Sequence, residues 1–151
     1  NADIILNTDF AATLADYAGV NAPSCSEGRS FRDNLRGETP RDWRQSMYYR
    51  YWTHHKIRPA HMGIRNHRYK LMFLYGDPLN ATGSEKTPVT PSWEFYDLLA
   101  DPHEDHNVYG SPAYAGEIEK MKRELLKLRR EVGDTDTATP RMKEIMDKYY
   151  W

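Results

Sequence analysis

Four short runs of aromatic and β-branched residues, bounded by turn residues, constrain most strongly what this chain can fold into. Runs of this composition and length are typical of β-strands. The polar link Arg65–Arg68 fits a tight connection between two antiparallel strands, whereas residues 76–91 are too poor in apolar side chains to pack and predict a polar loop. The expected strands of this antiparallel meander are residues 47–53, 60–66, 68–75 and 93–98.

One long amphipathic segment follows the expected strands. Apolar residues recur at intervals of three and four between Pro112 and Val132, which places them on one face of a helix. Pro112 suits the first turn of that helix, and Gly133 ends it. A shorter helix is expected after Pro140, with an apolar face made of Met142, Ile145 and Met146. These patterns predict an α+β fold, in which a small antiparallel sheet of about four strands packs against the long C-terminal helix.

The N-terminal part is predicted to be helical. The pattern from Thr8 to Gly19 indicates a helix with Thr8 as its N-cap, and its apolar side chains are Phe10, Leu14 and Tyr17. The polar stretch 37–44 is the best candidate boundary, which divides the chain into residues 1–37 and 38–151. Because the chain begins inside an apolar run, we expect its true N-terminus to lie upstream.

The charge balance argues against several classes of partner. The 151 residues include 21 basic and 22 acidic side chains, so the formal net charge is −1 and no overall field attracts nucleic acid or an anionic membrane. No apolar run is long enough to cross a bilayer. The single cysteine, Cys25, leaves no internal disulfide to form. We therefore expect no nucleic-acid partner and no membrane span.

Three segments of the chain resemble the C-terminal part of the type I sulfatases. The first is NTDFAATLADYAGVNAP with GRSFRDNLRG, which is similar to the family's Asp-rich helix start, Ala-Gly-Val end and Gly-x-Ser turn. The second is HMGIRNHRYKLMFLYG, similar to Gly-Ile-Arg followed by a basic residue and Tyr-Lys-Leu. The third is WEFYDLLADPHEDHNVYGSPAY, similar to Glu-Leu-Tyr-Asp-Leu, Asp-Pro and Asn-Val-Tyr. The three segments occur in the family's order and cover nearly the whole chain.

The resemblance implies that this chain is one part of a two-domain parent protein. The parent would hydrolyse sulfuric esters with a large N-terminal domain of the alkaline-phosphatase-like fold, and residues 1–37 would be the C-terminal remnant of that domain. The family's nucleophile is a formylglycine made from Cys or Ser in a Cys/Ser-x-Pro-x-Arg motif, and it acts beside a calcium ion. The parent is therefore expected to bind calcium and carry formylglycine, whereas this chain is expected to hold no cofactor, no metal and no catalytic residue.

Cys25 matches only part of that motif. Arg29 lies at the right distance, but Glu27 stands where the motif has proline. A thiol becomes reactive only in an electropositive setting that lowers its pKa, and the sequence does not establish such a setting. We therefore expect Cys25 to be a loop cysteine and the isolated chain to be inactive.

Three histidines are the candidates for contact with substrate, because the resemblance implies that this subdomain lies beside the catalytic cleft. His61 opens an expected strand and could donate to a sugar hydroxyl or a sulfate oxygen; the alternative is that it caps or pairs within the sheet. His54 and His55 lie in the preceding loop with Lys56 and Arg58. A basic tip suits an anionic polysaccharide, although a solvated turn gives the same pattern. Their spacing matches no zinc site.

Charged and aromatic residues on the expected strands have structural interpretations. Opposite charges on neighbouring strands stabilise their pairing, so we expect structural ion pairs, rather than sulfate ligands, at Arg65, Lys70, Glu94 and Asp97. The aromatic stretch 48–52 alternates between the two faces of a strand, so half of it is expected in the core. The other half, if exposed, could stack on sugar rings.

These observations lead to one expected function and two alternatives. We expect the C-terminal subdomain of a sulfatase that acts on sulfated carbohydrate, which completes the fold, helps to form the substrate cleft and has the missing catalytic domain as its partner. The alternatives are a non-catalytic carbohydrate-binding or interaction module, and part of a sulfatase-like phosphotransferase or phosphonate hydrolase. The family's usual substrates imply a periplasmic or secreted parent. If Ile4–Leu6 and the helix over residues 8–19 have lost their apolar partner, we expect them to pack back on the small sheet, to swap between chains or to mediate a homodimer.

Overall fold

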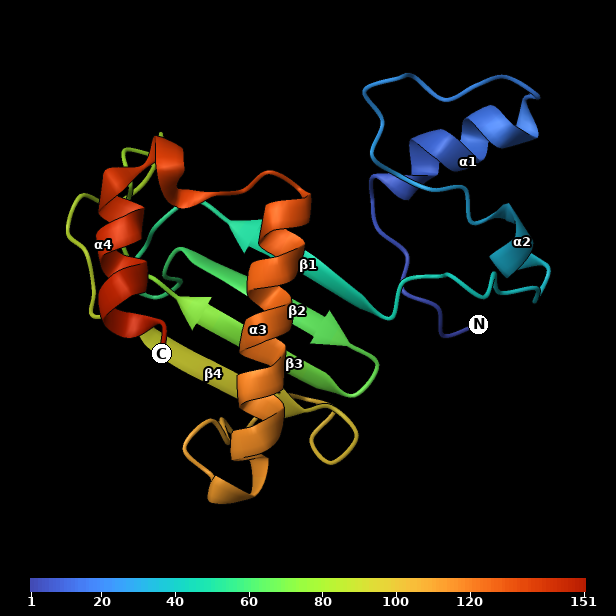
Figure 1. Ribbon diagram of the computed structural model, residues 1–151. Coiled ribbons are helices and arrows are strands. Elements are labelled where there is room, and N and C mark those ends of the chain that lie inside the picture. The colour runs from blue at the N-terminus through green and yellow to red at the C-terminus, as the bar shows by residue number, and fades with distance from the viewer. The chain divides into compact units, whose positions relative to one another are not determined.

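Four short strands, β1 (Ser46–Tyr51), β2 (His61–Asn66), β3 (Tyr69–Leu74) and β4 (Ser92–Asp97), form one sheet in this computed structural model, which describes residues 1–137 and 139–151 in full (Figure 1). Within the described residues the strand order is β1-β2-β3-β4. The pairs β2–β3 and β3–β4 are antiparallel, with His61 opposite Leu74 and Tyr69 opposite Asp97. The predicted meander is therefore confirmed.

Asn66 closes the turn between β2 and β3. Its side-chain Oδ1 accepts the backbone N–H of Arg68 at 2.9 Å and that of Tyr69 at 2.6 Å. An asparagine side chain that accepts from amides two and three residues ahead stabilises a reversal of the chain. The tight connection predicted for these residues is therefore present, and it sets the register in which Arg65 lies opposite Lys70.

Two helices lie on one face of the sheet (Figure 1). The short helix η1 (Pro112–Tyr114) leads into α3 (Ala115–Glu131), and η2 (Asp136–Ala138) precedes α4 (Pro140–Tyr149). Apolar side chains of the strands and of both helices form one core, whose members include Met62, Ile64, Leu71, Phe73, Phe95, Ile118, Met121, Leu125, Met142, Ile145 and Met146. The α+β fold is confirmed. None of the described helices combines the length and the apolar character that a bilayer requires.

The long helix buries two cations that its apolar pattern does not predict. Lys122 and Arg129 are buried, whereas Val132, which was expected on the apolar face, is exposed. The Nζ of Lys122 donates to the backbone oxygen of Tyr150 at 2.6 Å, and Arg129 pairs with Asp136 at 2.7 Å. A buried charge is stable only when it is paired or hydrogen-bonded. Both cations therefore bind α3 to segments that follow it in the chain.

The polar segment 76–91 packs more closely than its composition predicts. The N–H of Gly76 donates to the oxygen of Ala60 at 3.0 Å, and the N–H of Val89 donates to the oxygen of Gly76 at 2.8 Å. Gly76 has a φ of +60°, and a Cβ there would lie 2.6 Å from Cγ2 of Val89. Backbone hydrogen bonds, one glycine and the side chain of Leu79, which packs against the core, hold this segment in place. Residues 76–91 form the predicted loop, but the expectation that this loop does not pack is wrong.

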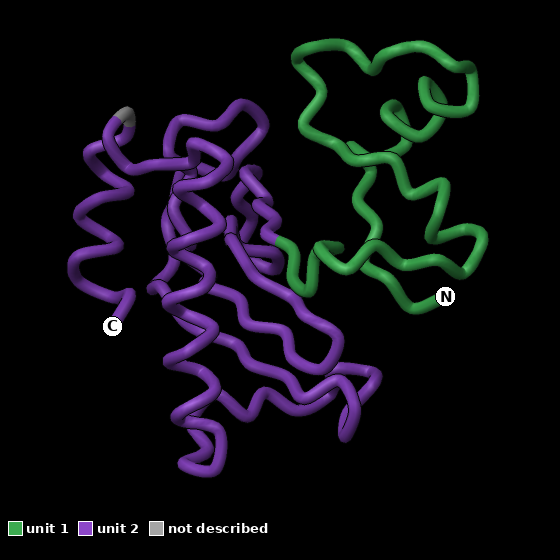
Figure 2. Tube along the Cα trace, turned by 45° about the vertical axis from the view of Figure 1, so that its right-hand side comes forward, with its two compact units in different colours: residues 1–47 green, residues 48–151 purple. Residues whose placement is uncertain are grey.

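The chain divides into two compact units, residues 1–47 and 48–151 (Figure 2). The first unit contains α1 (Asp9–Tyr17) and α2 (Arg32–Leu35). Helix α1 forms where the sequence predicts it, and its apolar side chains Phe10, Leu14 and Tyr17 are exposed. The predicted boundary at residue 37 concerns the domains of the parent protein and stays a prediction.

Asp9 organises the first unit through its buried carboxylate. Thr8 occupies the N-cap position of α1, but its side chain makes no capping hydrogen bond. The carboxylate of Asp9 instead accepts the N–H of Leu6 at 2.7 Å, the N–H of Arg29 at 2.9 Å and both guanidinium nitrogens of Arg44. Burial raises the pKa of Asp9, but these hydrogen bonds outweigh it and lower the pKa below its ordinary value. Asp9 therefore stays ionised near neutral pH.

Candidate functional site

The face of the sheet that points away from α3 and α4 contains His61, the first candidate for contact with substrate. Side chains alternate along a strand, and Met62 and Ile64 lie in the core with the helices. The neighbouring His61 and Gly63 therefore point to the opposite face. We refer to this surface as the His61 face, and its residues are Tyr49, Tyr51, Arg58, His61 and Gly63.

His61 is held in one orientation by its neighbours. Its Nδ1 lies 2.8 Å from the carbonyl oxygen of Pro59, and because a carbonyl can only accept, Nδ1 carries the hydrogen. The ring stacks on Tyr51 with centroids 5.4 Å apart and meets Tyr49 edge-on at 5.9 Å. Within the described chain Nε2 has no hydrogen-bond partner. The imidazole therefore presents Nε2 as an acceptor when neutral and as a donor when protonated.

Tyr49 and Gly63 form a close contact that sequence reasoning missed. A Cβ on Gly63 would lie 2.5 Å from Cζ of Tyr49 and 2.6 Å from its Oη, so only glycine admits the ring. Among the described residues, nothing pairs with the buried Tyr49 hydroxyl. Burial raises the pKa of Tyr49, so the hydroxyl keeps its hydrogen. A glycine inside an expected strand was the available signal, because such a glycine often marks a close approach.

His54 lies apart from the His61 face and is fully buried. Its Nδ1 accepts the N–H of Ala60 at 3.4 Å, and its Nε2 lies 3.0 Å from the carbonyl oxygen of Thr87. Its backbone N–H donates to Oγ of Ser84 at 2.9 Å. Both ring nitrogens are therefore engaged inside the chain, where they join the β1–β2 connection to the segment 76–91.

His55 lies at the tip of the β1–β2 connection. It borders a hollow of about 500 Å³ with Ile57, Arg58 and Glu85. The Nδ1 of His55 lies 3.5 Å from the carboxylate of Glu85, and Ile57 is 98% exposed. A hydrogen bond from the backbone of Lys56 lowers the pKa of Glu85. The tip therefore combines two basic side chains, one carboxylate and one exposed apolar side chain.

The charged strand residues pair with side chains outside the predicted set. Lys70 pairs with Glu104, and Asp97 pairs with Arg68 at 2.8 Å. Glu94 accepts the hydroxyl of Tyr96 at 3.0 Å, and burial raises the pKa of that hydroxyl to about 12. Arg65 is exposed and forms no ion pair within the described residues.

Cys25 and the described carboxylates are the remaining candidates for a catalytic or metal site in this chain. Cys25 is exposed in a turn, and the guanidinium of Arg29 pairs with Asp42 at 2.9 Å. The described part of the chain has no group of three or more His, Cys, Asp or Glu side chains that could hold a metal ion. These residues therefore do not fit the calcium site that the sulfatase resemblance implies for the parent.

Comparison with known proteins identifies the relatives of this chain. A family profile described as "N-sulphoglucosamine sulphohydrolase, C-terminal" matches residues 1–131. An N-acetylglucosamine-6-O-sulfatase of Bacteroides thetaiotaomicron is 38% identical over 130 residues, which cover 83% of this chain and 20% of that protein. A multifunctional alkaline phosphatase superfamily protein of Trinickia caryophylli is 25% identical over 134 residues, which cover 80% of this chain and 23% of that protein.

Solved structures share the fold. A protein in complex with its substrate D-glucosamine-2-N,6-O-disulfate gives a TM-score of 0.68 at 34% identity, over 85% of this chain and 24% of that one. A phosphonate monoester hydrolase from Silicibacter pomeroyi gives 0.60 at 24% identity, over 82% of this chain and 24% of that one, a likeness of fold alone. This chain thus spans 20% to 24% of the length of these relatives. Since the family profile matches 131 of the 151 residues, the chain belongs to the C-terminal family of the N-sulphoglucosamine sulphohydrolases, a family of sulfatases.

Proposed function

We propose that this chain is the C-terminal subdomain of a sulfuric ester hydrolase that acts on a sulfated carbohydrate. The observation that carries the proposal is the 38% identity with an N-acetylglucosamine-6-O-sulfatase over 83% of this chain. The related structure that holds a disulfated glucosamine supports the same substrate class. The subdomain completes the fold of the parent protein, and the His61 face forms part of the wall of its substrate cleft.

The chemistry of the His61 face suits a sulfated sugar. The hydrogen bond from Nδ1 of His61 to Pro59 directs Nε2 outward, where it accepts from a sugar hydroxyl or, when protonated, donates to a sulfate oxygen. The guanidinium of Arg58 lies over the ring of Tyr51, 4.9 Å from its centroid, and adds positive charge beside an aromatic surface. Among the three predicted histidines, His61 is the principal substrate contact and His55 a secondary one, because both ring nitrogens of His54 are already bonded.

The reacting centre of the parent lies outside this chain. We propose that the preceding domain supplies the formylglycine nucleophile and the calcium ligands, and that residues 1–37 belong to that domain. The exposed apolar side of α1, with Phe10, Leu14 and Tyr17, packs against it in the parent. The parent is periplasmic or secreted, where sulfated polysaccharides are encountered.

Substitution of His61 in the full-length parent tests the cleft role. We expect His61→Ala to lower kcat/KM on glucosamine 6-sulfate about 10- to 100-fold, the cost of one hydrogen bond to a charged group. The matched control is His67→Ala, because His67 is exposed in the turn between β2 and β3. An unchanged kcat/KM in a folded His61→Ala parent would retire the proposal for this residue.

The isolated chain tests where the reacting centre lies. We expect no release of fluorophore from 4-methylumbelliferyl sulfate above the rate in buffer, because the chain lacks the nucleophile motif and a metal site among its described residues. Turnover that persists through repeated purification would place catalytic residues in this chain and contradict the proposal that the reacting centre lies in the preceding domain.

A phosphorus ester is the second candidate substrate class of the parent. The 25% identity with a multifunctional alkaline phosphatase superfamily protein favours it. The ratio of kcat/KM for an aryl sulfate to that for the matching aryl phosphonate monoester separates the two classes. A parent with neither activity, and with no Cys/Ser-x-Pro-x-Arg motif upstream, would instead support a non-catalytic carbohydrate-binding module.

A further inference from the structure

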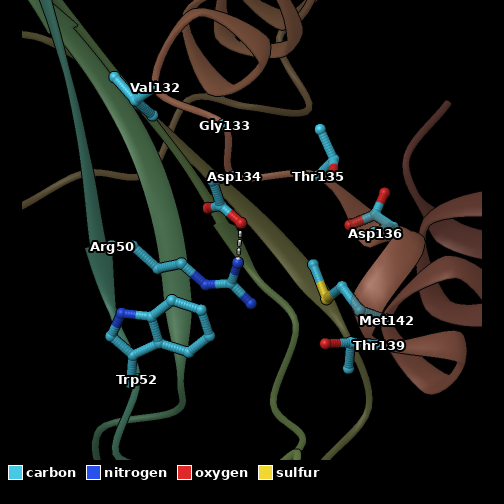
Figure 3. A pocket seen from close by; sticks show the side chains of 9 residues that line it. All are labelled: Arg50, Trp52, Val132, Gly133, Asp134, Thr135, Asp136, Thr139 and Met142. Carbon is cyan, nitrogen blue, oxygen red and sulfur yellow. Dashed lines mark hydrogen bonds and ion pairs between the residues drawn. The ribbon is translucent and has the colours of Figure 1, made fainter.

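A pocket of about 300 Å³ opens between the end of β1 and the segment that joins α3 to α4 (Figure 3). Arg50 and Trp52 line it on the strand side, and Asp134, Asp136 and Thr139 line it on the helix side. These residues lie far apart in the sequence, and no motif in the sequence connects them. The pocket is also separate from the His61 face, since Arg50 and Trp52 alternate with Tyr49 and Tyr51 along the strand.

Arg50 is the buried polar group of this pocket. Its side chain is only 7% exposed, and its Nη1 donates to Oδ1 of Asp134 at 2.5 Å. The guanidinium lies over the ring of Trp52, 3.6 Å from the centroid. Among the described residues, none accepts a hydrogen bond from Nε of Arg50. A buried N–H without an acceptor is costly, and because this atom has almost no accessible surface it does not itself face a ligand in the pocket.

The charges around the pocket are balanced. Asp134 pairs with Arg50, and Asp136 pairs with Arg129 at 2.7 Å. Burial raises the pKa of Asp134, but hydrogen bonds from Tyr48 and Arg50 outweigh it and lower the pKa, so the carboxylate is ionised at neutral pH. Because two cations are matched by two carboxylates, the pocket favours a neutral polar ligand over an anion.

Most of the pocket wall lies beyond the region that the family profile matches. The match ends at residue 131, whereas the lining residues on the helix side are 132–136, 139 and 142. The family match therefore does not extend over this wall of the pocket.

We propose that this pocket binds one uncharged pyranose residue of a carbohydrate. Its volume is at the lower end of the range for ligand pockets, which suits a single sugar ring. Trp52 is 52% exposed and offers an aromatic surface against which the C–H face of a pyranose packs. Asp136 and Thr139, which line the pocket, supply acceptors for the sugar hydroxyls.

Titration of the 151-residue chain with simple glycosides tests this proposal. The probes are methyl β-D-glucopyranoside and methyl β-D-galactopyranoside, followed by nitrogen–proton NMR spectra. We expect saturable shifts of the indole N–H of Trp52, with dissociation constants in the millimolar range. Glucose 6-sulfate, titrated under the same conditions, binds no more tightly than the neutral sugars.

Two variants and one control locate the binding. We expect Trp52→Ala to weaken sugar binding about tenfold through loss of the aromatic surface, and Thr139→Val, which keeps the side-chain shape, to weaken it several-fold. The control Trp151→Ala removes another exposed indole that does not line the pocket and leaves binding unchanged. The proposal is overturned if the folded wild-type chain shows no shifts, or if both pocket variants bind the sugars as tightly as the wild type does. Tighter binding of the sulfated sugar overturns the assignment to an uncharged ligand.

Discussion

Gly63 lies where the ring of Tyr49 crosses the His61 face of the sheet. The absence of a side chain at this one position lets the ring approach the backbone of β2, and the ring in turn contacts His61. The orientation of His61 thus depends on a residue that has no side chain. The sequence alone predicts His61 as a candidate for contact with substrate. It does not predict the close packing at Gly63, because that contact is made by Tyr49 of a neighbouring strand.

Replacement of Gly63 by alanine should destabilise the second unit. A Cβ would lie 2.5 Å from Tyr49, and relief of that overlap requires the ring to move. We expect Gly63→Ala to lower the free energy of unfolding by about 1–3 kcal/mol, measured by urea denaturation. The control is Gly116→Ala in α3, where a Cβ meets nothing within 4 Å, and it should stabilise the chain by about 0.5–1 kcal/mol. Equal stabilities for the two variants would contradict the contact.

Lys122 predicts a pH dependence at the residue scale. Burial lowers the pKa of Lys122 from its ordinary 10.5. The unfolded chain then binds this proton more tightly than the folded chain, so folding is favoured increasingly as pH rises toward 10.5. We expect the free energy of unfolding of the wild type, relative to Lys122→Met, to increase between about pH 7 and about pH 10. A constant difference over this range would show that Lys122 titrates normally.

At the scale of elements, periodicity predicted helices and strands better than it predicted how their ends are held. Helix α1 begins where the sequence indicates, but the side chain of its expected cap, Thr8, makes no capping hydrogen bond. The adjacent Asp9 instead accepts hydrogen bonds from Leu6, Arg29 and Arg44. A carboxylate that joins three separated stretches of chain holds the first unit together more than one capping bond does.

Asp9→Asn should loosen the whole first unit. Arg44 would lose its buried carboxylate partner, and breaking such a pair costs about 3 kcal/mol. We expect the amides of Leu6 and Arg29, which donate to Asp9, to exchange with solvent much faster in the variant. Asp33→Asn is the control, because its ion pair with Arg36 is exposed and contributes at most about 1 kcal/mol. Unchanged exchange at both amides would mean that Asp9 does not support this unit.

At the scale of the whole molecule, exposed apolar side chains on α1 predict association. Phe10, Leu14 and Tyr17 leave a contiguous apolar surface exposed, and such surfaces bind a partner. Without the parent's preceding domain, we expect the chain to form dimers at high concentration in sedimentation experiments. The double variant with Phe10→Glu and Leu14→Glu should be monomeric; a wild-type chain that is monomeric at every concentration tested would exclude this role for α1.

The sequence by itself determined the elements, their order and the family. Hydrophobic period and turn chemistry are local properties, so the four strands, the Asn66 turn and the buried face of α3 with Ile118 and Leu125 followed directly. The family motifs are equally local, and the profile match over residues 1–131 confirms the resemblance.

Only the tertiary structure decided which polar groups are buried and with what they pair. Three histidines close together in the sequence have different environments, because the segment 76–91 folds over His54 and leaves His61 on the sheet. Likewise Arg50 of β1 meets Asp134 only because the segment that follows α3 lies beside that strand. Partners so far apart in the sequence are chosen by the packing of whole elements, and no local pattern encodes that choice.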